Sequence, residues 1–241
     1  GVPASAIDSF AASNSQVQAF AYGDPNLTEE SAETYTLGAV LTPTLPLGRG
    51  SMTVDYFNIK IDDVISGLGA SYYINGCYRL GRPDNCSRVV RNTETGQIEY
   101  VTTGIANQDQ LSTSGIDVGL NWSVDLAEIS SKIPGRLSIN ENFSWLDSYK
   151  LNGNEYASTS SGGIGGQYPE FKSTLSVAYN LNDFTAQLRW NYASSVEEDW
   201  GTVPNPKTPA LSYFDLSLRQ VIMKNFEITA WSRPRQAPPP G

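Results

Sequence analysis

The chain has 241 residues and a formal net charge of -9, with 16 basic residues, 25 acidic residues and no histidine. An acidic chain of this kind has little with which to neutralise phosphates, so nucleic acid is excluded as an expected partner. The lack of histidine removes the commonest general base and the commonest metal ligand. No apolar run approaches the roughly 18 residues of a membrane-spanning helix, which excludes a helical membrane protein.

Alternation of apolar and polar residues predicts about eight β-strands, and no long stretch shows the spacing of an amphipathic helix. The clearest strand is "GIDVGLNWSVDL" (115–126), where Ile116 begins a series of apolar side chains on one face and Asp117 begins a polar series on the other. A strand with one apolar and one polar face is half-buried. In chain order, the expected strands cover residues 33–41, 51–61, 115–126, 136–145, 171–181, 184–192, 214–221 and 226–230.

Two of these strands depart from simple alternation. In 51–61 the apolar positions change phase between Tyr56 and Phe57. A β-bulge, or a strand that leaves the apolar zone, explains such a change. In 136–145 the apolar face is interrupted by Glu141.

The connections between the expected strands alternate in length. Long ones cover about 63–110, 152–168 and 197–209, whereas the others are short or medium, such as "NLND" and "AEISSKIPG". All long loops therefore leave one rim of an up-and-down sheet, which is typical of outer-membrane barrels and not of Greek-key sandwiches. Aromatic residues such as Trp122 and Tyr179 lie near strand ends, as interfacial girdles require. These patterns favour lipid over a soluble core against the apolar face.

Two cysteines, Cys77 and Cys86, lie in a polar loop of an otherwise cysteine-free chain. Such a pair indicates a disulfide in an oxidising compartment, with two unpaired cytosolic thiols as the alternative. A zinc site would need two more ligands. Possible ligand contacts, with an ordinary exposed loop as the alternative, are Tyr72, Tyr73, Tyr78, Arg79, Arg82 and, beside the acidic stretch 197–199, Trp200.

No catalytic constellation is found, since the serines have no histidine partner for nucleophilic catalysis. We therefore expect neither an enzyme nor a cofactor or metal site.

Several segments resemble one family in the same order along the chain. "GDPNLTEESAETYTLGAVLTP" (23–43) resembles the Gly-Asn-Pro-x-Leu-x-Pro-Glu and Tyr-Thr-Leu-Gly segment of TonB-dependent outer-membrane receptors. "SMTVDYFNIKIDDVI", "LSTSGIDVGLNW" and "ALSYFDLSLRQVIMKNFEITA" are similar to later strands of these receptors, up to about residue 230. The loop "NGCYRLGRPDNCSRVVRNTETGQIEYV" is similar to a disulfide-closed extracellular loop in one branch of the family, which implies a bond between Cys77 and Cys86.

The resemblance implies an all-β fold, a transmembrane up-and-down antiparallel β-barrel. The chain is expected to be an incomplete C-terminal part, about eight strands of a 22-stranded barrel. Residues 1–30 would be an extracellular loop and strand lead-in, and residues 31–230 the partial barrel. Residues 231–241, "WSRPRQAPPPG", depart from the family as a Pro-rich tail.

The function that the resemblance implies is TonB-dependent, energised uptake of a scarce nutrient through the outer membrane of a Gram-negative bacterium. A ferric siderophore, cobalamin or an oligosaccharide is the expected kind of ligand. Further expected partners are outer-membrane lipid and a TonB-type coupling protein, which would bind an N-terminal region missing from this chain. The alternatives are a non-energised porin or surface adhesin barrel, and a soluble secreted carbohydrate-binding β-sandwich.

Overall fold

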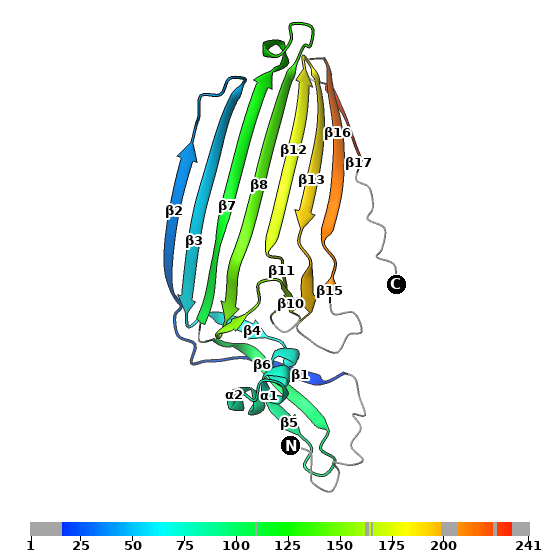
Figure 1. Ribbon diagram of the computed structural model, residues 1–241. Coiled ribbons are helices and arrows are strands. Elements are labelled where there is room, and N and C mark those ends of the chain that lie inside the picture. The colour runs from blue at the N-terminus through cyan, green and yellow to red at the C-terminus, as the bar shows by residue number, and fades with distance from the viewer. Residues whose placement is uncertain are drawn as a thin grey trace.

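The computed structural model describes residues 16–108, 110–161, 164, 166–198, 207–223 and 226–232. Its main feature is one antiparallel sheet in which each long strand pairs with its neighbours along the chain (Figure 1). The expected all-β, up-and-down architecture is therefore confirmed. In sheet order the long strands are β2 (Ser31–Leu41), β3 (Arg49–Asp62), β7 (Gln110–Asp125), β8 (Arg136–Leu151), β12 (Phe171–Leu181), β13 (Phe184–Ala193), β16 (Leu211–Met223) and β17 (Phe226–Ser232).

The connections are sorted by length between the two ends of the sheet, as the sequence predicts. At one end, which we call the turn end, β12 and β13 are joined by residues 182–183, and β7 and β8 by 126–135 with a short 3₁₀ turn at Leu126–Glu128. At the other end, the loop end, residues 63–109 and 152–170 form long connections. The small strands and helices gather at the loop end (Figure 1).

The strand register collects apolar side chains on one face of the sheet and polar side chains on the other. On the apolar face, Val177 of β12 lies opposite Ile139 of β8 and Leu188 of β13. On the polar face, Asp117 of β7 lies opposite Ser144 of β8, whose Oγ donates a hydrogen bond to Asp117 Oδ1 at 2.6 Å. The sheet thus has one apolar face and one polar face, as the wall of a membrane barrel has toward lipid and toward its lumen.

The phase change in β3 comes from a reversal of the two faces near the loop end. β3 pairs with β2 and β7 without any register shift, so of the two expected explanations the bulge is wrong and a strand that leaves the apolar zone is confirmed. Instead Ile61 lies on the polar face, directly opposite Leu111 of β7, and both pack against a buried apolar cluster. A bulge occurs one pairing further along, between β7 and β8 at Ser114/Gly115.

The buried cluster belongs to a small unit formed by the long 63–109 connection. Its helices, α1 (Ala70–Tyr78) and α2 (Pro83–Cys86), fall where the sequence predicts only a loop. Its strands are β4 (Ile65–Leu68), β5 (Val89–Arg91) and β6 (Ile98–Asn107), with β1 (Gln18–Gly23) added in parallel to β6. The cluster consists of Val64, Leu68, Tyr72, Tyr73, Val101, Leu151 and Tyr156.

Leu151 is the last residue of β8. The small unit therefore packs against the polar face of the long strands, at their loop end. The hydrophobic core of the described chain therefore sits at the loop end. The remaining short strands also lie there, namely β9 (Asn154–Glu155), β10 (Thr159–Ser161), β11 (Gly166–Tyr168), β14 (Val196–Glu198) and β15 (Lys207–Thr208).

Within the described residues, no helix has both the length and the apolar character needed to cross a membrane.

Candidate ligand-binding site

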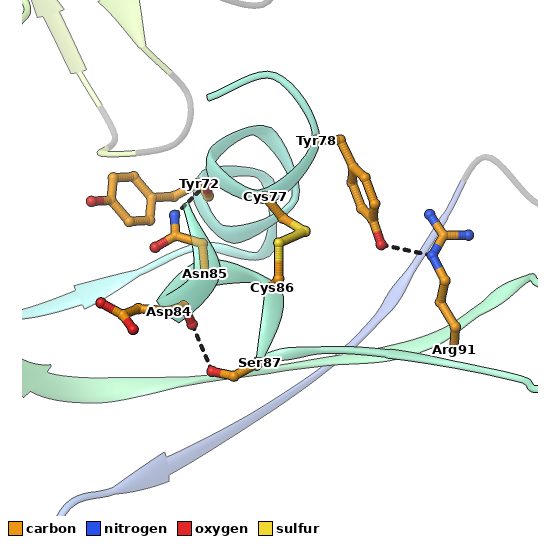
Figure 2. The surroundings of a disulfide bond; sticks show 8 residues. All are labelled: Tyr72, Cys77, Tyr78, Asp84, Asn85, Cys86, Ser87 and Arg91. Atoms are coloured by element: carbon orange, nitrogen blue, oxygen red, sulfur yellow. Dashed lines mark hydrogen bonds between the residues drawn. A yellow bond between two sulfur atoms is a disulfide. The ribbon is translucent and has the colours of Figure 1, made fainter. Parts of the chain in front are cut away.

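The two helices of the small unit are joined by a disulfide between Cys77 and Cys86 (Figure 2). The expected disulfide is therefore confirmed. α2 begins at Pro83, whose fixed φ angle and missing N–H suit the first position of a helix. The bond closes a segment that carries three of the six sequence-predicted ligand contacts, Tyr78, Arg79 and Arg82.

This segment is the most basic part of the chain. Residues 70–92 contain four arginines and one acidic residue, Asp84, which gives +3 in a chain of net charge -9. Grouped charges of one sign raise the local concentration of ligands of the opposite sign. The segment 70–92 therefore favours anions, although the whole 63–109 connection, with five acidic residues and four arginines, has a net charge of -1. The arginines are Arg79, Arg82, Arg88 and Arg91.

A cavity of about 350 Å³ lies between α1 and the loop that follows β8. Arg79 and Arg82 line it from the basic segment, and Asn154 and Tyr156 line it from the other loop. Arg82 Nη2 donates a hydrogen bond to Asn154 Oδ1 at 2.5 Å, which joins the two loops. We call this the α1 cavity.

Glu155 is the one carboxylate among the described residues that line the α1 cavity. Its oxygens accept hydrogen bonds from Ser148 Oγ at 2.6 Å and from the backbone N–H groups of Tyr149, Tyr156 and Ala157. Burial acts to raise the pKa of Glu155, but these hydrogen bonds hold it below its usual range. Glu155 therefore keeps its negative charge, and with Arg79 and Arg82 it leaves the described lining of the cavity with a net charge of +1.

A second cavity of about 280 Å³ shares Tyr72 and Arg82 with the α1 cavity and adds Tyr73 and Arg88. The guanidinium carbon of Arg88 lies 5.2 Å from the centroid of the Tyr73 ring. Burial raises the pKa of the Tyr73 phenol, and the charge of Arg88 partly offsets this rise. Arg82 therefore stands between two cavities, each with a further arginine in its wall.

The predicted contacts do not all meet in one place. Tyr72, Arg79 and Arg82 share the α1 cavity, although only 9% of Tyr72 is exposed and its ring belongs to the core. Tyr73 is buried to 4% exposure and lines the second cavity but not the α1 cavity. Tyr78 lies beside the disulfide, where its hydroxyl accepts a hydrogen bond from Arg91 Nε at 2.6 Å (Figure 2).

The ligand-contacting role of these residues stays a prediction, and Trp200 lies outside the described residues. Sequence reasoning missed Arg88, although its place in the basic segment is a signal that was there to be used. It also missed Asn154, Tyr156 and Ser161, which come from a loop with no distinctive pattern. Among the described residues, no three His, Cys, Asp or Glu side chains converge as a metal site.

The chain was compared with family models, curated proteins and solved structures. The family model described as "TonB dependent receptor-like, beta-barrel" matches residues 2–231. Two structures of mutants of the ferric enterobactin receptor PfeA from Pseudomonas aeruginosa are similar to the chain. One has a TM-score of 0.54 and 13% identity over 89% of this chain and 27% of that one, and the other a TM-score of 0.53 and 12% identity over 85% and 25%.

The FrpB iron transporter from Neisseria meningitidis gives a TM-score of 0.46 and 10% identity over 81% of this chain and 25% of that one. The chain thus spans about a quarter of the length of these solved structures. Among curated proteins there is no match.

Proposed function

Because the chain belongs to the TonB-dependent receptor β-barrel family, we propose that it is part of a receptor for TonB-dependent, energised uptake of an extracellular nutrient across the outer membrane of a Gram-negative bacterium. The observation that carries this proposal is the family match over residues 2–231, joined to a sheet with one apolar face whose described long connections, after β3 and after β8, lie at one end, while most of the expected long loop 197–209 lies outside the described residues. The closed barrel to which such a sheet belongs satisfies backbone groups in lipid, while the long loops are free to select a ligand.

For the ligand, we propose an anionic iron chelate in preference to cobalamin or an oligosaccharide. Arg79 and Arg82 line one cavity and outnumber its carboxylate, Glu155, whose oxygens accept hydrogen bonds from Ser148 and Tyr149 of β8. Arginine binds carboxylate and other planar oxygen anions with two parallel, charge-assisted hydrogen bonds. A neutral sugar has no charge with which to strengthen such bonds. Ferric enterobactin, named for the structurally similar receptor PfeA, is a ligand of this class.

The test uses the full-length receptor in outer-membrane vesicles, with ferric citrate and a ferric tricatecholate as anionic probes and maltohexaose as a neutral probe. Replacing both Arg79 and Arg82 with alanine is expected to weaken binding of one or both anionic probes by about 30- to 100-fold or more, because hydrogen bonds to charged groups are lost. Lys132→Ala, in the connection between β7 and β8 at the turn end, removes one positive charge away from the cavity and controls for loss of charge alone. Preferential binding of maltohexaose would contradict the proposed ligand class.

The energised step is tested separately in cells. Uptake of the bound probe should stop when the TonB-type coupling protein is deleted, while binding at the surface continues. Uptake that persists in the deletion strain would support the non-energised porin in place of the proposed receptor.

A further inference from the structure

α1 carries a glycine, Gly76, in its interior, where glycine is the least favourable residue after proline. The reason lies in Asn85 of α2. A Cβ added to Gly76 would stand 2.7 Å from Asn85 Cγ and closer still to Asn85 Nδ2. Gly76 therefore allows α2 to approach α1 more closely than any other residue would permit.

Asn85 and the backbone of Gly76 together seat α2 on α1. Asn85 has only 8% of its surface exposed, and its Nδ2 donates a hydrogen bond to the carbonyl oxygen of Tyr72 at 3.4 Å (Figure 2). The backbone N–H of Arg82 donates to the carbonyl oxygen of Gly76 at 2.9 Å. The contact thus reaches from the middle of α1 to the residue that immediately precedes α2.

The disulfide alone does not fix this arrangement. Residues 79–82 and the Cys77–Cys86 bond both join the two helices covalently, and both leave α1 at its C-terminal end. The packing of Asn85 against Gly76 and its hydrogen bond to Tyr72 add a non-covalent attachment that extends toward the N-terminal half of α1. Arg82 is then held by its backbone at Gly76 and by its guanidinium at Asn154.

We propose that Gly76 and Asn85 are positioning residues that set the guanidinium of Arg82 between the two cavities and so determine the affinity for an anionic ligand. This inference rests on the proposed function, because it assumes that Arg82 binds the ligand. Two-point attachment orders Arg82 before the ligand arrives, so less conformational freedom is lost on binding. A shift of α2 keeps the charge of Arg82 but spoils the paired hydrogen-bond geometry that an oxygen anion needs.

The experiment measures ferric citrate and ferric tricatecholate binding to the full-length receptor in outer-membrane vesicles, at low and high salt, and follows the probe that the receptor binds. Gly76→Ala and Asn85→Ala are each expected to weaken binding by about 10-fold, and Arg82→Ala by about 30-fold. The double variant of Gly76 and Asn85 should have an affinity no lower than that of whichever single variant binds the probe less tightly, because both changes remove one shared contact. Gly67→Ala is the matched control, since its added Cβ would meet no atom closer than 3.8 Å.

The salt dependence separates positioning from collapse of the loop. In Gly76→Ala the charge of Arg82 remains, so added salt should still weaken binding as in the wild type, whereas in Arg82→Ala this dependence should fall. Loss of both affinity and salt dependence in Gly76→Ala, or multiplication of the two single effects in the double variant, would overturn the proposal.

Failure of this inference can be told apart from failure of the proposed function. If Arg82→Ala weakens binding but Gly76→Ala and Asn85→Ala do not, the positioning role is wrong and the ligand site stands. If Arg82→Ala binds as the wild type does, the ligand site itself is wrong. Mass spectrometry of the Cys77–Cys86 bond checks that each variant has folded, and Asn85→Ala carries the test if Gly76→Ala does not form the bond.

Discussion

Removing the disulfide should loosen the small unit at the loop end by a calculable amount. Cys77 and Cys86 are separated by 9 positions, so the bond closes a ring of ten residues. The chain-entropy relation then gives an entropy loss of about 9 cal/mol/K in the open state, or about 2.7 kcal/mol at 25 °C. Replacing both cysteines with serine should lower the free energy of opening α1 and α2 by that amount, which is about a 100-fold rise in the population of the open state.

Hydrogen exchange of the full-length receptor measures this opening directly. The N–H of Arg79, bonded to the carbonyl of Asn75, and the N–H of Arg82 should exchange about 100-fold faster in the double serine variant. Amides in the pairing of β12 with β13 serve as the internal control and should not change. An acceleration of less than about threefold at Arg79 and Arg82 would refute the entropic reasoning, and faster exchange throughout the sheet would show that the small unit does not open on its own.

Three further predictions concern the sheet and its loops. Val177→Lys, on the apolar face, should destabilise the lipid-embedded barrel by about 2–4 kcal/mol in denaturant titration, whereas its neighbour Ala178→Lys, on the polar face, should have a small effect; equal losses would contradict the assignment of faces. Leu151→Ala, at a site 5% exposed, should lower protection of the small unit from hydrogen exchange by about 2–4 kcal/mol, with Lys150→Ala within about 0.5 kcal/mol of the wild type. Because folding lowers the pKa of Glu155, its stabilisation of the turn is complete above its ordinary value of 4.5 and is lost as the pH falls through the lowered pKa. Acid should therefore increase proteolysis of the 152–170 loop, and Glu155→Gln should abolish this increase. An increase that persists in the variant would rule out Glu155 as its source.

The long strands were predictable because each has one apolar face and one polar face. The expected strand 171–181 is β12 itself, and the expected 184–192 lies within β13, which ends one residue later. Period-two alternation is a local property, so it is visible in sequence wherever a strand has one wet and one apolar side. The end of β17 was less visible, since the strand reaches Ser232, two residues beyond the expected 230.

The small unit and its cavities were not predictable in the same way. α1 contains Gly76 and Asn75, which are weak helix formers, and the helix is held by Asn85 and by the disulfide. The hydrogen bond from Arg82 to Asn154 joins residues 72 positions apart, and no local pattern records such a meeting. The same holds for Ile61, whose side of the strand depends on a cluster built by a different segment.

The reversal of faces at Ile61 and Leu111 decides where a chimera of two such receptors can be joined. If residues 63–109 alone were exchanged, then Ile61, Leu111 and Leu151 would lose the cluster on which they pack and present apolar side chains to water. A foreign loop would arrive without the strand ends that complete its own core. The segment to exchange is therefore the loop together with the strand ends that support it. The junctions of a chimera belong in the long strands, on the membrane side of Ile61, Leu111 and Leu151.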